Sequence, residues 1–244
     1  MTGYADIHCH IIPGVDDGAH DTEEALDMLR IMHDEGIRDV IATPHYHGGR
    51  METGIEKVKE RFEKLCAAKD SDGELSDMNL YLGCEIYYYP SVIEWLEEGR
   101  VSSLAGSGYV LLEFGFTMDK RMIFEGVSAV MNAGYLPVVA HVERYEKLLS
   151  DIGNVRELIS RGAYIQINSE AFYARHKVKS FVKKLLKNEM VHFLATDAHD
   201  TWHRGPYLAD AARYVSKHYG EDYCQRLLCT NPAAVINNGY IPLR

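Results

Sequence analysis

The stretch ADIHCH, residues 5–10, joins a short run of small and apolar residues to two histidines. A run of this length, rich in small and apolar residues, is typical of a buried β-strand. Because side chains alternate along a strand, His8 and His10 point to one face and Cys9 to the other. The stretch HFLATDAH, residues 192–199, ends in the same spacing with Asp197 and His199. Each stretch therefore predicts a strand that presents two metal-ligand side chains at its end.

Further apolar runs along the chain also end in a histidine or a glutamate. They are DVIATPH (39–45), LYLGCE (80–85), YVLLE (109–113) and PVVAH (137–141). With the two paired motifs and one aspartate, they give nine candidate ligands. These are His8, His10, Asp17, His45, Glu85, Glu113, His141, Asp197 and His199. Such a series predicts that several strands deliver ligands to one place.

The alternation of strands and helices predicts a mainly parallel sheet. Strands are expected near 4–9, 38–44, 79–86, 109–114, 135–141, 163–168 and 192–196. Helices are expected at 21–35, where Asp21 caps the start and Gly36 follows the end, and near 54–69, 119–133, 151–161, 176–189 and 205–228. About seven such units favour a closed or nearly closed α/β barrel, whose functional residues lie at the carboxyl ends of the strands. An open doubly wound sheet is the alternative, but it would gather ligands from fewer strand ends.

Composition narrows the class of protein. The chain has 244 residues and no long linker, which fits a single domain over 1–244. The formal net charge of −10 argues against nucleic acid or an anionic membrane as a general partner. Five widely spaced cysteines without a C-x-x-C pair fit reduced thiols, and no signal peptide or membrane-spanning stretch is visible. We therefore expect a cytoplasmic protein.

Nine ligands exceed the needs of one tetrahedral zinc ion. Mixed imidazole and carboxylate donors suit two or three ions of Mn²⁺, Fe or Zn²⁺, and Glu85 could bridge two of them. Such ions acidify a water for attack on a phosphate. The competing interpretation, carboxylates buried in salt bridges, makes two strand-ending glutamates costly without a cation.

Two arginines follow these ligands closely. Arg144 lies three residues after His141, and Arg204 lies five after His199. Arginine binds phosphate through two parallel hydrogen bonds, so the pair favours a phosphorylated substrate, although a salt bridge explains either one alone. The C-x5-R cradle of thiolate phosphatases, the G-x-S-x-G elbow and the phosphate-binding P-loop are absent.

The motifs DIHCH, VDDG, ATPH, GCE, LLEF, AHVERY and ATDAH resemble those of the polymerase-and-histidinol-phosphatase (PHP) family of metal-dependent phosphoesterases. The match is closer to its bacterial branch of tyrosine-protein phosphatases linked to capsule and exopolysaccharide synthesis. The resemblance implies a distorted (β/α)7 barrel with a trinuclear site built from the nine ligands. It favours Asp17 over Asp16 in VDDG, and it implies that Arg144 and Arg204 hold the phosphate. It also implies manganese as the first candidate metal, and phosphotyrosine in the tail of a bacterial tyrosine kinase as the substrate.

Two positions depart from the family pattern. Val142 stands where the family often has proline, and Asp200 where it often has asparagine. We consider Asp200 or His47 as a proton donor, and Tyr87, Tyr88 and Tyr89 as residues that flank the phenyl ring or pack in the core.

Other functions stay open from the sequence alone. One is a small-molecule phosphatase of the same fold, acting on histidinol phosphate or a nucleotide. A silent binding subunit should have lost ligands, and a metal-dependent amidohydrolase should show a lysine at a strand end; neither feature is visible. The sequence also allows a homo-oligomer.

Overall fold

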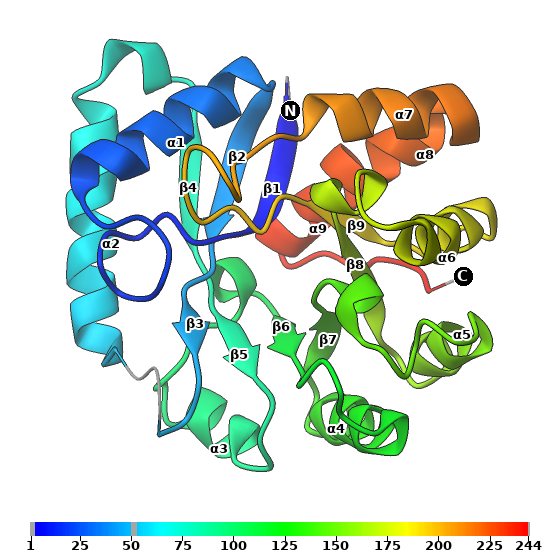
Figure 1. Ribbon diagram of the computed structural model, residues 1–244. Coiled ribbons are helices and arrows are strands. Elements are labelled where there is room, and N and C mark those ends of the chain that lie inside the picture. The colour runs from blue at the N-terminus through cyan, green and yellow to red at the C-terminus, as the bar shows by residue number, and fades with distance from the viewer. Residues whose placement is uncertain (1–2, 50–52, 244) are drawn as a thin grey trace.

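The computed structural model describes residues 3–49 and 53–243, so both predicted domain boundaries lie outside the described residues. The strands surround a common axis (Figure 1). They are β1 (Tyr4–Cys9), β2 (Ile37–Ala42), β3 (His45–Tyr46), β4 (Asn79–Leu82), β5 (Glu85–Tyr87), β6 (Tyr109–Glu113), β7 (Leu136–Val139), β8 (Tyr164–Asn168) and β9 (Phe193–Ala195). Every pairing between these strands is parallel, in the orders β1-β2-β4 and β3-β5-β6-β7-β8-β9.

The two groups of strands are connected at two breaks. The predicted strand 79–86 is divided into β4 and β5, and β3 continues the direction of β2 beyond the predicted strand 38–44. Pro44, which has no backbone N–H, separates β2 from β3, and Gly83 lies between β4 and β5. A Cβ at Gly83 would lie 2.9 Å from the Ile41 side chain, so only glycine fits this close approach. Pairing continues across both breaks, since Gly83 N donates to Ala42 O at 2.8 Å and Glu85 N to Pro44 O at 3.1 Å.

The barrel is closed between the first strand and the last. Asp197 N donates to His8 O, and His10 N donates to Ala198 O, both at 2.8 Å. Counting each broken strand once, the described residues form seven strand positions in a ring. The α/β barrel expected from the sequence is confirmed, and the open doubly wound alternative is wrong.

The helices lie outside the strands (Figure 1). They are α1 (Thr22–Asp34), α2 (Ile55–Asp70), α3 (Val92–Glu97), α4 (Lys120–Asn132), α5 (Gly153–Ser160), α6 (His176–Lys187), α7 (Ala209–Tyr219), α8 (Glu221–Gln225) and α9 (Asn231–Ile236). The predicted cap of α1 is confirmed, because Asp21 Oδ1 accepts a hydrogen bond from Glu24 N at 3.0 Å.

One predicted helix, 205–228, is wrong as a single element. The chain is still irregular at Leu208, whose N–H donates to Glu35 Oε2 at 2.8 Å. Gly220 then has a φ of 97°, which ends α7 and starts α8, and a π-helical turn (Arg226–Thr230) leads into α9. The short helix α3 was not predicted.

Alternating strand side chains form two apolar layers. Val110, Leu112 and Ile165 belong to the layer that packs against the helices. Tyr109, Leu111 and Tyr164 belong to the filling of the barrel interior. The lower interior is thus a packed core, and the polar residues lie above it at the carboxyl ends of the strands.

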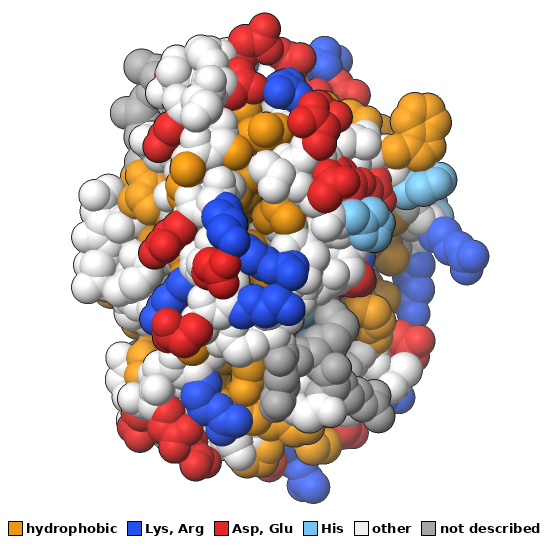
Figure 2. Space-filling model, turned by 90° about the vertical axis from the view of Figure 1, so that its left-hand side faces the viewer, with side chains coloured by type: hydrophobic (Ala, Val, Ile, Leu, Met, Phe, Trp, Pro, Cys, Tyr) orange, Lys and Arg blue, Asp and Glu red, His pale blue; other side chains and the backbone are white. Residues whose placement is uncertain are grey.

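The surface over the face shown in Figure 2 carries Lys and Arg side chains beside Asp and Glu side chains. On α2, Lys64 pairs with Glu60 and Lys59 with Glu56. All five cysteines are free thiols. Within residues 3–49 and 53–243, no helix has the length and apolar character needed to cross a membrane.

Candidate metal centre

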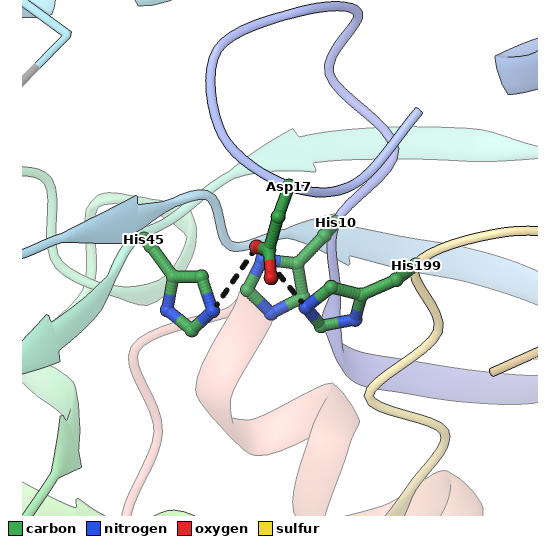
Figure 3. A group of neighbouring side chains, drawn as sticks. All are labelled: His10, Asp17, His45 and His199. Atoms are coloured by element: carbon green, nitrogen blue, oxygen red, sulfur yellow. Dashed lines mark ion pairs between the residues drawn. The ribbon is translucent and has the colours of Figure 1, made fainter. Parts of the chain in front are cut away.

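All nine predicted ligands converge at the carboxyl end of the barrel, where they form overlapping groups. One group contains His10, Asp17, His45 and His199, whose candidate ligand atoms all lie within 4.8 Å of one another. Figure 3 shows the Asp17 carboxylate between the imidazoles of His45 and His199. Asp17 Oδ1 lies 3.5 Å from Nε2 of each of these histidines. Three separate segments of the chain thus meet around one carboxylate.

A second group is fully buried and contains His8, His10, Glu85 and Asp197. His8 Nε2 lies 3.3 Å from Glu85 Oε1 and 3.4 Å from Asp197 Oδ1. The His10 Nε2 atom lies only 3.3 Å from that of His8. Cys9, between them, belongs to the outer apolar layer, so the predicted alternation of His8, Cys9 and His10 is confirmed.

Glu85 also belongs to a third group, with Glu113 and His141. Its Oε1 atom lies 2.8 Å from His141 Nε2, and its Oε2 atom lies 2.8 Å from His45 Nδ1. A carboxylate shared between groups in this way can bridge two ions.

His47 lies in a further group with His45 and Glu113, and its Nε2 is 3.2 Å from Glu113 Oε2. We had considered it as a proton donor, but its position is that of an additional ligand. The signal was present in the sequence, since His45 and His47 repeat the spacing of His8 and His10.

Several buried atoms in these groups have no hydrogen-bond partner. They include Nδ1 of His45 and His141, Nε2 of His47 and His199, and Oε2 of Glu85 and Glu113. Buried polar groups are normally paired, and an unpaired one costs about 1–3 kcal/mol. The atoms approach one another closely without hydrogen-bond geometry, as side chains do when they aim at a common point. The mixed imidazole and carboxylate donor set therefore fits divalent metal ions.

The pKa shifts of the clustered side chains also agree with a site for divalent metal ions. Burial opposes the charged forms, yet Glu85 and Asp197 raise the pKa of His8, and Asp16 raises that of His10. Burial would likewise raise the pKa values of Glu85 and Asp197, but the facing imidazoles lower both well below the ordinary range. The carboxylates thus favour positive charge at this place, which divalent cations also provide.

Asp16 lies behind the cluster rather than in it. Its Oδ2 accepts hydrogen bonds from His10 Nδ1 at 2.8 Å and from His45 N at 2.9 Å. This fixes His10 with Nε2 facing the cluster. The following Gly18 is required here, because a Cβ would lie 2.0 Å from the His10 carbonyl oxygen.

Strand β8 carries none of the predicted ligands, but it supports them from below. Gln166 Oε1 accepts hydrogen bonds from His8 Nδ1 at 3.2 Å and from His141 N at 2.6 Å. Gln166 Nε2 donates to Asn168 Oδ1 at 2.7 Å, and Asn168 Nδ2 donates to Asp197 Oδ2 at 2.8 Å. The sequence analysis missed both residues, although their i, i+2 spacing in a buried strand was a usable signal.

Two of the candidate ligands have left-handed backbone conformations. His141 has a φ of 30° and Asp197 a φ of 54°, and each lies two residues beyond the end of its strand. Residues with a β-carbon seldom adopt this region, and such strain concentrates at functional sites. The turns bend both side chains back over the barrel.

Both predicted phosphate-binding arginines contact Asp197. Arg144 Nη1 lies 2.8 Å and Arg204 Nη2 lies 3.0 Å from Asp197 Oδ2. Val142, the departure from the family pattern, is buried and begins the short 3-10 helix η3 (Val142–Arg144). With valine at position 142, Arg144 still lies at the edge of the cluster, in contact with Asp197.

Asp200, the other departure, shapes the loop before Arg204. Its Oδ1 accepts hydrogen bonds from the backbone N–H groups of Trp202 and His203 at 2.6 Å, and from that of Arg204 at 3.1 Å. Partial burial opposes ionisation, but these hydrogen bonds lower the pKa of Asp200. It is therefore a turn-forming carboxylate rather than the proton donor that we had considered.

The three consecutive tyrosines lie in two different places. Tyr88 packs against Phe114 in the core, with ring centroids 5.2 Å apart. Tyr87 stacks beside His47 at 4.7 Å, and Tyr89 follows it at 5.4 Å. Two of the three rings thus lie on the side of the cluster.

The fold and the site define an α/β barrel with a candidate metal centre at the carboxyl ends of its strands. The fold is similar to that of a phosphotriesterase homology protein from Escherichia coli, with a TM-score of 0.64, 15% identity, and 96% of this chain and 99% of that chain covered.

The family model for capsular polysaccharide synthesis, CpsB/CapC, matches residues 4–237. The chain belongs to this family, which confirms the branch indicated by the sequence motifs.

The chain is 35% identical to tyrosine-protein phosphatase CpsB of Streptococcus pneumoniae over 238 residues, covering 95% of this chain and 97% of the relative. It is 32% identical to tyrosine-protein phosphatase YwqE of Bacillus subtilis (strain 168) over 219 residues, covering 89% and 85%. A crystal structure from work on YwqE and CpsB, described as unique metal-dependent tyrosine phosphatases, matches with a TM-score of 0.90, 30% identity, and 98% and 97% coverage.

Proposed function

We propose that this chain is a metal-dependent phosphatase that hydrolyses phosphotyrosine in proteins. The observation that carries the proposal is the convergence of nine ligand-type side chains, all but Asp17 buried or half-buried, with two arginines beside them. Five of the nine carry a buried atom without a hydrogen-bond partner. The similarity to the tyrosine phosphatases of Streptococcus and Bacillus supports the choice of substrate.

The residues that would hold the metal are His8, His10, Asp17, His45, Glu85, Glu113, His141, Asp197 and His199, with His47 as a further candidate. Two or three divalent ions fit this number of donors, and manganese is our first candidate, with iron and zinc as alternatives. When bound, such ions supply an acidified water and neutralise charge on the phosphate.

Arg144 and Arg204 are the residues that we assign to the phosphate. In the structure both guanidinium groups face Asp197, with side chains 24% and 34% exposed, so they are directed at the cluster and reachable from solvent. Planar guanidinium groups match phosphate oxygens and stabilise charge that develops on them. A phenol leaves with a pKa of about 10, so the leaving group needs little protonation.

For the physiological substrate, we propose the phosphotyrosine-bearing C-terminal tail of a bacterial tyrosine kinase that controls capsule or exopolysaccharide synthesis. The description of the matching family supports this setting.

The test begins with protein stripped by a chelator and reloaded separately with Mn²⁺, Fe²⁺, Zn²⁺ or Mg²⁺. Each form is assayed on phosphotyrosine and phosphoserine peptides and on histidinol phosphate. We expect no turnover without metal, the highest turnover with Mn²⁺, and a kcat/KM for phosphotyrosine at least tenfold above the others. A preference for histidinol phosphate would instead establish a small-molecule phosphatase.

The arginine assignment is tested with Arg144→Ala and Arg204→Ala. We expect each to lower kcat/KM about 100-fold, since each removes a charged hydrogen-bond donor from the transition state. Arg121→Ala on α4, whose side chain is 84% exposed, serves as the control. Unchanged activity in both active-site variants would disprove the phosphate assignment.

A further inference from the structure

A cavity of about 510 Å³ opens beside the metal cluster. Its lining comes from the segments that follow β6, β7 and β8 and from the start of α6. The lining residues are Phe116, Glu143, Arg144, Leu149, Glu170, Ala171, Tyr173, Ala174 and Val178.

Two residues join this cavity to the cluster. Arg144 Nη1 lies 2.8 Å from Asp197 Oδ2, while its Nη2 donates to Glu170 Oε1 at 2.7 Å on the cavity side. The Phe116 ring lies edge-on to the imidazole of His141, with centroids 5.9 Å apart. A ligand whose phosphate meets Arg144 therefore has the cavity directly beside it.

The walls of the cavity are apolar. Phe116 is 45% exposed and Tyr173 is 67% exposed, although both are large aromatic residues. Leu149 and Val178 pack against the core while still lining the cavity. The charged groups of the lining are Glu143, which is buried, and the Arg144–Glu170 pair. The volume lies within the range of about 300–1,000 Å³ that is typical of ligand pockets.

Strand β8 explains why the cavity lies here. It is the strand position without a predicted metal ligand, and its carboxyl end continues into the 3-10 helix η4 (Ser169–Phe172). This segment and the two residues after it supply Glu170, Ala171, Tyr173 and Ala174 to the lining. The segment that follows β8 thus lines the cavity, whereas the segments at the other strand ends carry candidate metal ligands.

We propose that this cavity is a subsite for an apolar side chain close to the phosphotyrosine in a peptide substrate, an inference that rests on the proposed function. In an extended peptide, neighbouring side chains on one face are roughly 7 Å apart, so a residue near the phosphotyrosine reaches a cavity that adjoins Arg144. Apolar walls favour an apolar side chain and disfavour a charged one, which would lose its hydration there. The cavity thereby selects among phosphotyrosine sites by the residues around them.

The test compares peptides with one phosphotyrosine and either leucine or asparagine at each of the three positions on both sides. Leucine and asparagine have similar shapes and differ in polarity. We expect one position at which leucine raises kcat/KM about tenfold over asparagine, the effect of burying most of an apolar side chain. Phenyl phosphate has no flanking residue, so its kcat/KM measures hydrolysis of the phosphate ester without any contribution from the subsite.

Ala174→Trp is the decisive variant, because it fills the cavity from a half-buried position outside the cluster. It should remove the leucine preference and leave kcat/KM for phenyl phosphate within twofold of wild type. Val178→Asn, which makes the opposite wall polar, should weaken the same preference without filling the space. Ala67→Trp, at an exposed position on α2, is the matched control and should keep the preference.

Three results would overturn the subsite. They are equal kcat/KM for all peptides with wild type, a leucine preference that survives Ala174→Trp in folded protein, or a preference lost equally in Ala67→Trp. If phenyl phosphate is hydrolysed while peptides are not distinguished, the subsite alone is wrong. If neither phenyl phosphate nor any peptide is hydrolysed by metal-loaded protein, the proposed function fails, and the subsite fails with it.

Discussion

The two ends of the barrel interior differ in whether their buried polar atoms have hydrogen-bond partners. At the carboxyl ends of the strands, ring nitrogens of His45 and His141 and carboxylate oxygens of Glu85 and Glu113 are buried without partners. At the other end, the Tyr109 hydroxyl donates to Gly239 O at 2.9 Å and the Tyr164 hydroxyl to Ile241 O at 2.8 Å. His192 Nδ1 accepts a hydrogen bond from Ile165 N at 3.1 Å.

The difference separates two reasons for burying a polar side chain. At the lower end the polar atoms complete hydrogen bonds within the chain, and they hold the C-terminal segment across the opening. At the upper end, buried ring nitrogens and carboxylate oxygens have no hydrogen-bond partner within the chain, so they are available to bind metal ions. We therefore expect changes at the upper end to affect metal binding and activity, and changes at the lower end to affect folding.

The largest effect is expected from Glu85→Gln at the upper end. The substitution keeps the shape of the side chain but removes the charge shared between two ligand groups. Metal content, measured by elemental analysis, should fall, and kcat/KM for a phosphotyrosine peptide should fall 100-fold or more, to roughly 1% of wild type. The metal-free variant should unfold at a lower temperature than metal-free wild type, because His8 loses the buried carboxylate that faces it.

Glu63→Gln, at an exposed position of α2, is the control for this substitution. Full metal content and activity in Glu85→Gln would show that the unpartnered atoms at the upper end are not a metal site.

An intermediate effect is expected from Gln166→Leu, between the two ends. The substitution removes the acceptor that orients His8 and leaves the His141 N–H without its partner. Residues that orient metal ligands contribute about 10- to 100-fold to affinity or activity. Titration with Mn²⁺ should show weaker binding of that size, whereas Gln225→Leu, exposed on α8, should bind as wild type does. Unaltered affinity would make the hydrogen bonds of Gln166 structural only.

The smallest effect is expected at the lower end, in the pH dependence of folding. Burial lowers the pKa of His192 to about 4, below the value of about 6.5 in an unfolded chain. Between these values the unfolded chain binds the extra proton, so the stabilising effect of neutral His192 is present above pH 6.5 and declines as the pH falls toward 4. From pH 7.5 to pH 5 the contribution of His192 to the free energy of unfolding should fall by about 2 kcal/mol, measured as the difference between wild type and His192→Gln in urea denaturation of metal-free protein.

His192→Gln, which can still accept the hydrogen bond from Ile165, should lose about 2 kcal/mol less than wild type over the same pH interval. His218→Gln, at an exposed position of α7, should follow the wild-type curve. Parallel curves for wild type and His192→Gln would contradict a neutral buried His192.

The sequence predicted the upper end of the barrel better than the rest. Each ligand candidate follows an apolar run, and parallel strands bring their carboxyl ends together, so local pattern and topology lead to the same result. The choice of Asp17 over Asp16 came from the family resemblance. In the structure Asp17 lies among the imidazoles and Asp16 behind His10.

Other features depend on contacts that no local pattern contains. Gln166 and Asn168 are ordinary strand residues until barrel closure brings His8 and Asp197 to them. The helix predicted at 205–228 is divided at Gly220, whose φ of 97° separates α7 from α8, and the two helices pack against each other. The apolar cavity is built from several loops, so its residues are scattered along the sequence.

The closure of the barrel between β1 and β9 has a consequence for the order of events on the ribosome. His8 and His10 leave the ribosome first, whereas Asp197 and His199, which complete their groups, follow only when most of the chain has been made. Chains fold from the N-terminus as they emerge, so β1 initially has an open edge on the side of β9, and His8 and His10 still lack Asp197. The complete site can therefore load its metal only after synthesis has passed β9, and a chain released before that point is an open sheet without a complete metal centre.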